Sequence, residues 1–247
     1  MNPHSRHAFS LTELLVVLGI IMLLILILLP VVARVRAAAR STKCLANVQQ
    51  WGYAYQMYLN ANNGQTISEP TGNGLQHHEW WDILKPYNSN VQLSLLCPDG
   101  SEPSPRPPAR QIKGTAGAYW ELNTQRGLER GSYGINEWIE SPYPPHRPAA
   151  AGKYHFPVQK PDQIPLLGDA CQFRVSPESG DPVPANLQIP TPSNGDQGVA
   201  EFCIDRHAMA VNIVFLDGHA EHVPLARLWK LDWSPTFVSR DVVVLKK

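Results

Sequence analysis

The chain has 247 residues, of which 43% are hydrophobic and 17% are charged, and its 21 basic and 21 acidic side chains give a net charge of zero. This composition is typical of a folded chain of one or two domains and excludes a disordered protein. The balanced charge argues against a protein that binds nucleic acid, which would carry a basic excess. Prolines concentrate between Pro98 and Pro192, so we expect long loops in the middle of the chain.

The first predicted element is a transmembrane helix over residues 9–33. Residues 14–33 carry no charge, and at about 1.5 Å per residue they span about 30 Å, the thickness of a bilayer core. Pro30 lies near the far end, where a kink must be tolerated. Glu13 precedes the uncharged run directly, and a carboxylate at membrane depth is costly enough to indicate a function.

Three interpretations of this segment compete. A secretory signal peptide would be cleaved near residues 33–39, but its apolar run is normally only about 7–15 residues long. An ordinary single-pass anchor explains the length and leaves the Glu13 carboxylate to extend to the interface. A different leader would be removed before the apolar run, so that the run stays in the mature protein.

The string "AFSLTELLVVLGII" at residues 8–21 supports the third interpretation. It resembles the N-terminal signal of type IV prepilins and type II secretion pseudopilins. The resemblance implies that a prepilin peptidase removes the leader, residues 1–8, by cutting between Ala8 and Phe9, and that Phe9 is then N-methylated. Glu13 is the fifth mature residue, as in the family, and Pro30 is the twenty-second. Ala8 stands where the family favours glycine, and Thr12 stands where a large aliphatic residue is usual.

Glu13 then has a physical explanation as an assembly residue. In a filament its carboxylate would meet the positive amine of Phe9 in a neighbouring subunit, because a charge pair is far less costly in lipid than each charge alone. The resemblance implies a structural subunit of a type IV pilus-like filament or a type II secretion pseudopilus, with other subunits and the inner membrane as partners. It implies no enzyme activity and no cofactor.

The charges around the apolar run conflict with this orientation. Four basic residues follow the run and only Arg6 precedes it, so the positive-inside rule alone would place the large domain in the cytoplasm; the four are Arg34, Arg36, Arg40 and Lys43. The family resemblance instead places that domain in the periplasm or on the cell surface, and we follow the resemblance.

The helical pattern continues beyond the membrane as an amphipathic segment over residues 34–61. Apolar residues recur at spacings of three and four, which puts them on one face of a helix; they are Leu45, Val48, Gly52, Tyr55 and Leu59, widened by Cys44, Trp51 and Tyr58. Lys43, Asn47 and Gln50 are expected away from that face. Residues 62–64, Asn-Asn-Gly, are typical of a helix end. A globular domain is expected over residues 62–247.

Four widely spaced cysteines are candidates for disulfides in a domain outside the cytoplasm; they are Cys44, Cys97, Cys171 and Cys203. None forms a C-x-x-C pair, so a zinc ribbon or thioredoxin-type motif is not indicated. Three pairings are possible, and we favour Cys44 with Cys97 and Cys171 with Cys203. The alternative is four buried thiols.

The globular domain is predicted to contain a short helix at residues 76–88 and strands at residues 131–139, 162–170, 198–204 and 236–245. Asp217-Gly218 joins two apolar runs within residues 210–225, which predicts a hairpin with a type I′ turn. The predicted fold is α+β and pilin-like, with a long N-terminal transmembrane and amphipathic helix packed on an antiparallel β-sheet with long proline-rich loops.

Nine residues separate His207 from Asp217-Gly218, and this H-x9-D-G spacing resembles a C-terminal pattern in a large group of pilin-like proteins. Histidines and carboxylates in this region suggest a transition-metal site; they are His207, Asp217, His219, His222, Asp205 and Asp169. We favour structural roles, with Asp217 and Gly218 required by the turn and His207 bonded to a loop or to Asp169. No metal is expected, and the adjacent His77, His78 and Glu79 are a weaker candidate.

A second hypothesis is a membrane-tethered binding module of the envelope that does not assemble. Its ligand surface would be built from exposed tryptophans in the proline-rich region; they are Trp80, Trp81, Trp120 and Trp138. The alternative is that these side chains fill the core. Motifs of serine hydrolases, phosphate-binding loops and zinc proteases are absent from the sequence.

Overall fold

The computed structural model describes residues 11–67, 79–88, 94–103, 111–124, 126–140, 154, 156–188 and 198–244. The expected cleavage site at Ala8 and Phe9 lies outside these residues, as do His77 and His78. The chain forms two compact units, Met1–Ala39 and Arg40–Lys247. We describe each unit by itself.

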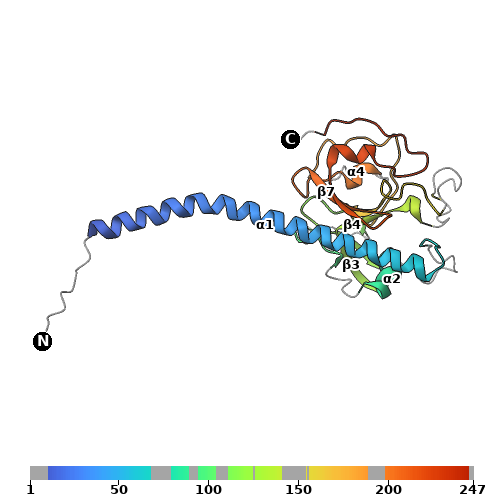
Figure 1. The fold of residues 1–247 in the computed structure, drawn as a ribbon, viewed down its shortest axis with the longest axis horizontal. Helices are drawn as coiled ribbons and strands as arrows, with labels where there is room; N and C mark the ends of the chain where they lie inside the picture. The colour runs from blue at the N-terminus through green and yellow to red at the C-terminus, as the bar shows by residue number, and fades with distance from the viewer. Residues whose placement is uncertain are drawn as a thin grey trace. The chain divides into compact units, whose positions relative to one another are not determined.

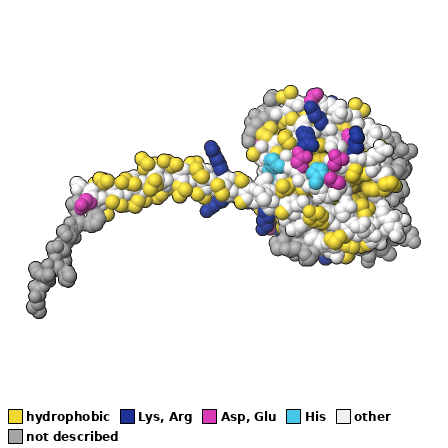
Figure 2. Space-filling model, in the orientation of Figure 1, with side chains coloured by type: hydrophobic (Ala, Val, Ile, Leu, Met, Phe, Trp, Pro, Cys, Tyr) yellow, Lys and Arg dark blue, Asp and Glu magenta, His cyan; other side chains and the backbone are white. Residues whose placement is uncertain are grey.

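The predicted long helix is present as α1, Leu11–Ala61, which has 51 residues and contains Pro30 (Figure 1). In its first-unit part, hydrophobic side chains cover most of the visible face (Figure 2), and nearly all of the large ones from Leu11 to Val35 are exposed. Among the described residues, α1 is long and apolar enough to cross a membrane. It ends where predicted, since Asn63 and Gly64 adopt positive φ angles of 53° and 77°.

The second unit contains two sheets. The three-stranded antiparallel sheet has the order β1 (Gln111–Ile112), β2 (Trp120–Thr124) and β3 (Gly127–Gly131). The five-stranded sheet has the order β6-β4-β5-β7-β8, with strands β6 (Arg174–Val175), β4 (Tyr133–Asn136), β5 (Pro165–Asp169), β7 (Ala210–Phe215) and β8 (Ala220–Pro224). The α+β prediction is confirmed, although the sheet is mixed because β4 and β6 are parallel.

Short helices complete the second unit. They are α2 (Trp80–Leu84), η1 (Lys85–Tyr87), η2 (Glu137–Ile139), α4 (Val199–Phe202) and η3 (Leu225–Lys230). Residues 79–88 of the predicted 76–88 helix are described, and they form α2 followed by η1. Strands are present where predicted within residues 131–139 and 162–170, as β4 and β5, but the end of the first prediction is wrong because Glu137–Ile139 form η2.

Two predicted strands are wrong. Within residues 198–204, Val199–Phe202 form the helix α4, where the Asp181 carboxylate accepts the Val199 N–H at 2.8 Å. A short apolar run has no periodicity that separates helix from strand, which explains the error. Residues 237–244 are irregular. They contribute Phe237, Val242 and Val244 as packing against the core, without pairing with a sheet edge.

The predicted hairpin is confirmed, with β7 paired to β8, but its turn is not type I′. Only Gly218, at φ 91°, has a positive φ; Asp217 does not. The Gly218 N–H donates to the Phe215 carbonyl at 2.9 Å, which closes a tight turn before the glycine. The hairpin therefore has a three-residue loop, in which a tight turn is followed by a single residue with positive φ. Such a loop needs only one glycine, whereas a type I′ turn needs positive φ at two positions.

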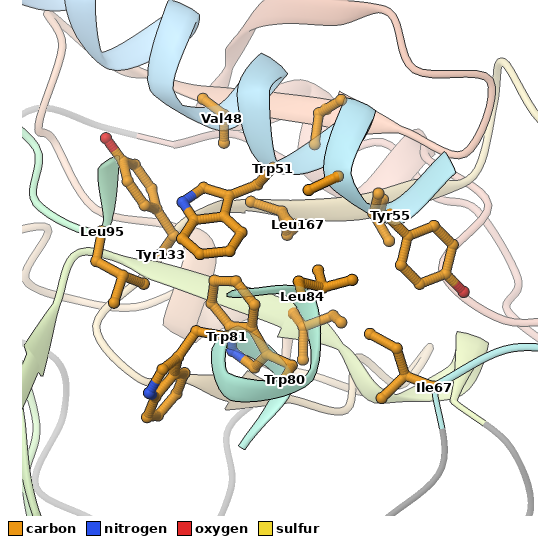
Figure 3. Close-up of a cluster of buried hydrophobic side chains, with 14 of the residues drawn as sticks. Val48, Trp51, Tyr55, Ile67, Trp80, Trp81, Leu84, Leu95, Tyr133 and Leu167 are labelled. Carbon is orange, nitrogen blue, oxygen red and sulfur yellow. The ribbon is translucent and has the colours of Figure 1, made fainter. Parts of the chain in front are cut away.

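The core lies on both faces of the five-stranded sheet. On one face, Val48, Trp51 and Tyr55 of α1 belong to one cluster with Trp80, Trp81 and Leu167, in which the Trp51 and Trp80 ring centroids are 5.0 Å apart (Figure 3). On the other face, Val211, Ile213 and Phe215 of β7 pack with a second cluster that includes Trp229 and Trp233. Strand β7 is therefore buried along its whole length.

The packing of α1 corrects two sequence interpretations. Asn47, expected away from the packed face, is buried and donates from Nδ2 to the Leu96 carbonyl at 3.1 Å. The tryptophans proposed as a ligand surface are core residues, since Trp80, Trp81 and Trp120 are at most 2% exposed. Trp138 is half-buried and donates to the Pro177 carbonyl at 2.7 Å. Tryptophan burial therefore removes the basis of the binding-module hypothesis.

Candidate functional site

Two regions of the chain carry candidate functional residues. The first is the start of α1, where Glu13 lies in the first turn with an exposed side chain, next to the apolar stretch. A carboxylate at this position has the positive end of the helix dipole beside it. The geometry is that of an apolar helix with one acid near its N-terminal end.

The second region is a buried group of four side chains in the second unit, which we call the Cys-Asp-His cluster: Cys44, Cys97, Asp169 and His207. One potential ligand atom from each residue lies within 4.8 Å of the others. The cysteines and Asp169 have no exposed surface, and His207 is 4% exposed. Each residue comes from a different segment of the chain. Cys44 is on α1, Cys97 is in a loop, Asp169 ends β5 and His207 precedes β7.

Direct contacts connect the four side chains. Cys44 Sγ donates to Asp169 Oδ1 at 3.3 Å and lies 3.5 Å from Oδ2. His207 Nε2 lies 3.3 Å from Asp169 Oδ2 and 3.4 Å from Cys97 Sγ. A single small space is thus surrounded by two sulfurs, one imidazole nitrogen and one carboxylate.

A second layer of groups holds Asp169 in place. Arg206 donates to Asp169 Oδ1 at 3.1 Å and also to the Ser132 carbonyl at 2.7 Å. The backbone N–H of Asn212 donates to Asp169 Oδ2 at 2.8 Å. Both side chains of the Arg206–Asp169 pair are fully buried. The carboxylate orientation is therefore set by partners outside the cluster.

Further partners orient His207 and Cys44. His207 Nδ1 lies 3.1 Å from Asp99 Oδ2, and among the described residues nothing completes a well-directed hydrogen bond to this nitrogen. Asp99 is itself paired with Arg40 of α1. The Tyr133 hydroxyl donates to Cys44 Sγ at 3.3 Å.

Ala208 and Met209, which follow His207, both have positive φ angles. Non-glycine residues pay about 1–3 kcal/mol for such a backbone.

The cluster perturbs the pKa values of its members. A hydrogen bond from Cys44 lowers the pKa of the Cys97 thiol to about 6, against burial, and His207 contributes to the lowering. Burial raises the pKa of Cys44 well above its usual value. Burial by itself lowers the pKa of His207, but hydrogen bonds to Asp169 and Cys97 outweigh it and raise the value to about 10.

Asp169 completes the charge pattern. Burial opposes its ionisation, but the hydrogen bond from His207 and the charge of Arg206 hold its pKa below the usual value. The directions of these shifts favour an ionised Cys97 thiol, a protonated His207 and an ionised Asp169. A thiolate beside a histidine is the arrangement of a nucleophile. Because the Cys97 side chain is fully buried, a substrate does not reach its sulfur.

Comparison with known proteins concerns the first region. Residues 3–29 match the family described as the prokaryotic N-terminal methylation motif. Residues 11–29 of the match form the start of the long apolar helix α1. The N-terminal region of the chain is type IV prepilin-like. No curated protein and no solved structure matches the chain.

In the second unit the structure brings together only part of the predicted site. His207 and Asp169 are in contact, as we expected for a structural contact. Asp217 and His219 instead pair with each other on the hairpin loop, at 2.6 Å between Oδ1 and Nδ1. His222 contacts Asn212, and Asp205 accepts the Met209 N–H. The H-x9-D-G pattern is thus divided between the cluster and the turn.

The cysteines correct a second expectation. All four are free, buried thiols, so neither the Cys44–Cys97 nor the Cys171–Cys203 disulfide is formed. Cys44 and Cys97 do lie in the same cluster, whereas burial raises the pKa of Cys171 and Cys203 to about 12. We missed Cys44 and Cys97 as partners of His207. The available signal was that cysteine, histidine and aspartate are all residue types that bind metals. No C-x-x-C spacing marked Cys44 and Cys97 as a pair.

Proposed function

We propose that this chain is a pilin-like or pseudopilin structural subunit that is made as a precursor, cut between Ala8 and Phe9 and N-methylated on Phe9. The observation that supports the proposal is that the methylation motif at residues 3–29 overlaps the start of the 51-residue helix α1. The mature subunit is held in the inner membrane by the apolar part of α1. Its second unit lies in the periplasm or on the cell surface.

Assembly into a filament or a secretion pseudopilus depends on Glu13 in this proposal. The apolar side chains around the first part of α1 are exposed, so in lipid they contact acyl chains and in an assembly they contact other copies. A charged side chain in a membrane-spanning helix is costly, up to about 2.5–3.5 kcal/mol at the bilayer centre. Pairing Glu13 with the amine of Phe9 in a neighbouring subunit removes much of that cost and sets the axial register of the packed helices.

Processing is tested by intact-mass and N-terminal peptide analysis of the protein isolated from membranes. The expected chain begins at N-methylated Phe9. A chain that still begins at Met1 contradicts processing at Ala8–Phe9. A chain that begins near Ala38 shows that the segment is a secretory signal peptide, in which case Glu13 has no role in the mature protein.

Assembly is tested by substituting Glu13→Val, with Thr12→Val as the matched control one residue away. We expect both variants to insert into the membrane, because each replaces a polar side chain by an apolar one. Glu13→Val should abolish filaments or cross-linked multimers, while Thr12→Val should retain them. Normal assembly of Glu13→Val contradicts the proposed charge pair.

A further inference from the structure

We propose that Cys44, Cys97, Asp169 and His207 bind one Zn²⁺ ion, which fastens helix α1 to the sheet of the second unit. The four side chains supply two sulfurs, one nitrogen and one oxygen, and these are the ligand types that structural zinc takes in proteins. All four are buried, so the site is closed to solvent and has no position for a substrate.

The distances between the ligand atoms fit a zinc tetrahedron. Zinc bonds of about 2.3 Å to sulfur and about 2.0–2.1 Å to nitrogen or oxygen give ligand-to-ligand edges of about 3.3–3.8 Å. The edges that meet at Asp169 Oδ2 are 3.5 Å to Cys44 Sγ and 3.3 Å to His207 Nε2. The edge from His207 Nε2 to Cys97 Sγ is 3.4 Å. The remaining separations are at most 4.8 Å, so small side-chain movements complete the tetrahedron.

The groups around the four ligands are those that commonly support a metal. Ligating histidines usually direct their second nitrogen toward a carboxylate, and His207 Nδ1 faces Asp99 at 3.1 Å. The Tyr133 hydroxyl bonds the Cys44 sulfur, and Asn212 and Arg206 bond the Asp169 carboxylate. Two thiolates and one carboxylate exceed the charge of Zn²⁺ by one, and the buried guanidinium of Arg206 balances this excess.

The donor set distinguishes zinc from the hard cations calcium, magnesium and manganese. Calcium and magnesium take oxygen ligands, and only one of the four donors is an oxygen. Thiolate sulfur with imidazole nitrogen favours zinc over manganese and other hard ions. Without an ion, two thiols, a carboxylate and an imidazole share a fully buried space, an arrangement that is costly unless protons or a metal hold the groups together.

The position of the ion gives it a structural role. Cys44 is in the part of α1 that belongs to the second unit, whereas Asp169 and His207 belong to β5 and to the loop before β7. One ion therefore joins the helix to two segments that are more than a hundred residues away in sequence. In the proposed subunit this attachment would transmit force between helix and globular unit, but the zinc site itself does not depend on assembly.

The test uses the full chain, purified in detergent under reducing conditions, with metal content measured by mass spectrometry. The expected result is one zinc per chain, which chelation removes and added Zn²⁺ restores. Reloading with Co²⁺ should give a thiolate-to-cobalt charge-transfer band and the strong visible bands of tetrahedral cobalt. Cys97→Ser and Cys44→Ser should each lose most of the zinc, and Cys203→Ser is the matched control because it is a buried cysteine outside the cluster.

Asp99→Asn separates a metal site from a merely structural cluster, because it leaves all four ligands in place. We expect it to bind zinc about 10–100-fold more weakly while the fold, followed by circular dichroism, is retained. Absence of zinc from the reloaded wild-type chain with its thiols free overturns the proposal. So does a Cys44–Cys97 disulfide in the native protein, or zinc binding by Cys97→Ser that equals that of the wild type.

Discussion

Substituting Gly52→Ala tests how closely α1 approaches the sheet. A Cβ at Gly52 would lie 2.5 Å from Val214 Cγ2 and 3.5 Å from Val214 Cβ, well inside normal contact distance for the first atom. Valine is β-branched and does not rotate away easily, so the helix or the strand must shift. Overpacking of this kind costs about 1–3 kcal/mol, whereas alanine in a helix gains about 1 kcal/mol over glycine. We expect the free energy of unfolding to fall by about 0–2 kcal/mol.

The sign of the effect should reverse when the obstacle is removed. In a Val214→Ala background the added methyl has space, so Gly52→Ala should stabilise the chain by about 1 kcal/mol. The coupling energy from the double-mutant cycle, about 1–3 kcal/mol, isolates the contact. Guanidinium unfolding of the full chain in detergent, followed by tryptophan fluorescence, measures all four variants.

Gly117→Ala is the control, because no atom lies within 4 Å of its Cβ position and its φ is not positive. Its effect should stay within about 0.5 kcal/mol. If Gly52→Ala is stabilising in the wild-type background, or if its effect is the same with and without Val214, then the helix does not pack against β7 as described.

Other substitutions and probes test the core. Trp51→Ala should lower the free energy of unfolding by about 3–5 kcal/mol, because the indole fills the interior and donates to the Ser94 carbonyl at 2.9 Å; a loss below about 1 kcal/mol in chemical denaturation would contradict its burial. Cys171 and Cys203 should resist alkylation at pH 8 and react after unfolding, since burial raises the pKa of each thiol to about 12. Peptide mapping measures the labelling, and a label on either residue in the native chain would contradict its burial. Acrylamide should quench the native fluorescence only weakly, because all the tryptophans except Trp138 are fully buried, and strong quenching would restore the idea of an exposed aromatic surface.

The long helix and the hairpin could be predicted because their determinants are local. An apolar run that continues into residues spaced by three and four gives a helix, and Asn63-Gly64 ends it. Two apolar runs joined by Asp217-Gly218 give the hairpin. The type of turn depends on the number of residues between the last paired residues of the two strands. Asp217-Gly218 alone therefore did not specify the turn type.

The Cys-Asp-His cluster could not be predicted because it is made by long-range packing. Cys44 and Asp169 are 125 residues apart, and Cys97 and His207 are 110 residues apart. Nothing local to Cys97 distinguishes it from Cys171 or Cys203, which are equally buried and take no part in the cluster. Asn47 was misplaced for the same reason, since its buried amide has a partner, the Leu96 carbonyl, that only the folded chain supplies.

The distance along the chain between α1 and β7 also has a consequence for biosynthesis. The packed face of α1 is covered by strands that are synthesised much later, as the contact of Gly52 with Val214 and the hydrogen bond from Asn212 to Ser41 show. At roughly 5–20 residues per second, the intervening stretch of about 160 residues takes about 8–30 s to make. During that interval β7 is missing from the sheet against which Trp51 and Tyr55 pack. The emerging chain therefore presents an aromatic helix to chaperones well before its own core can close.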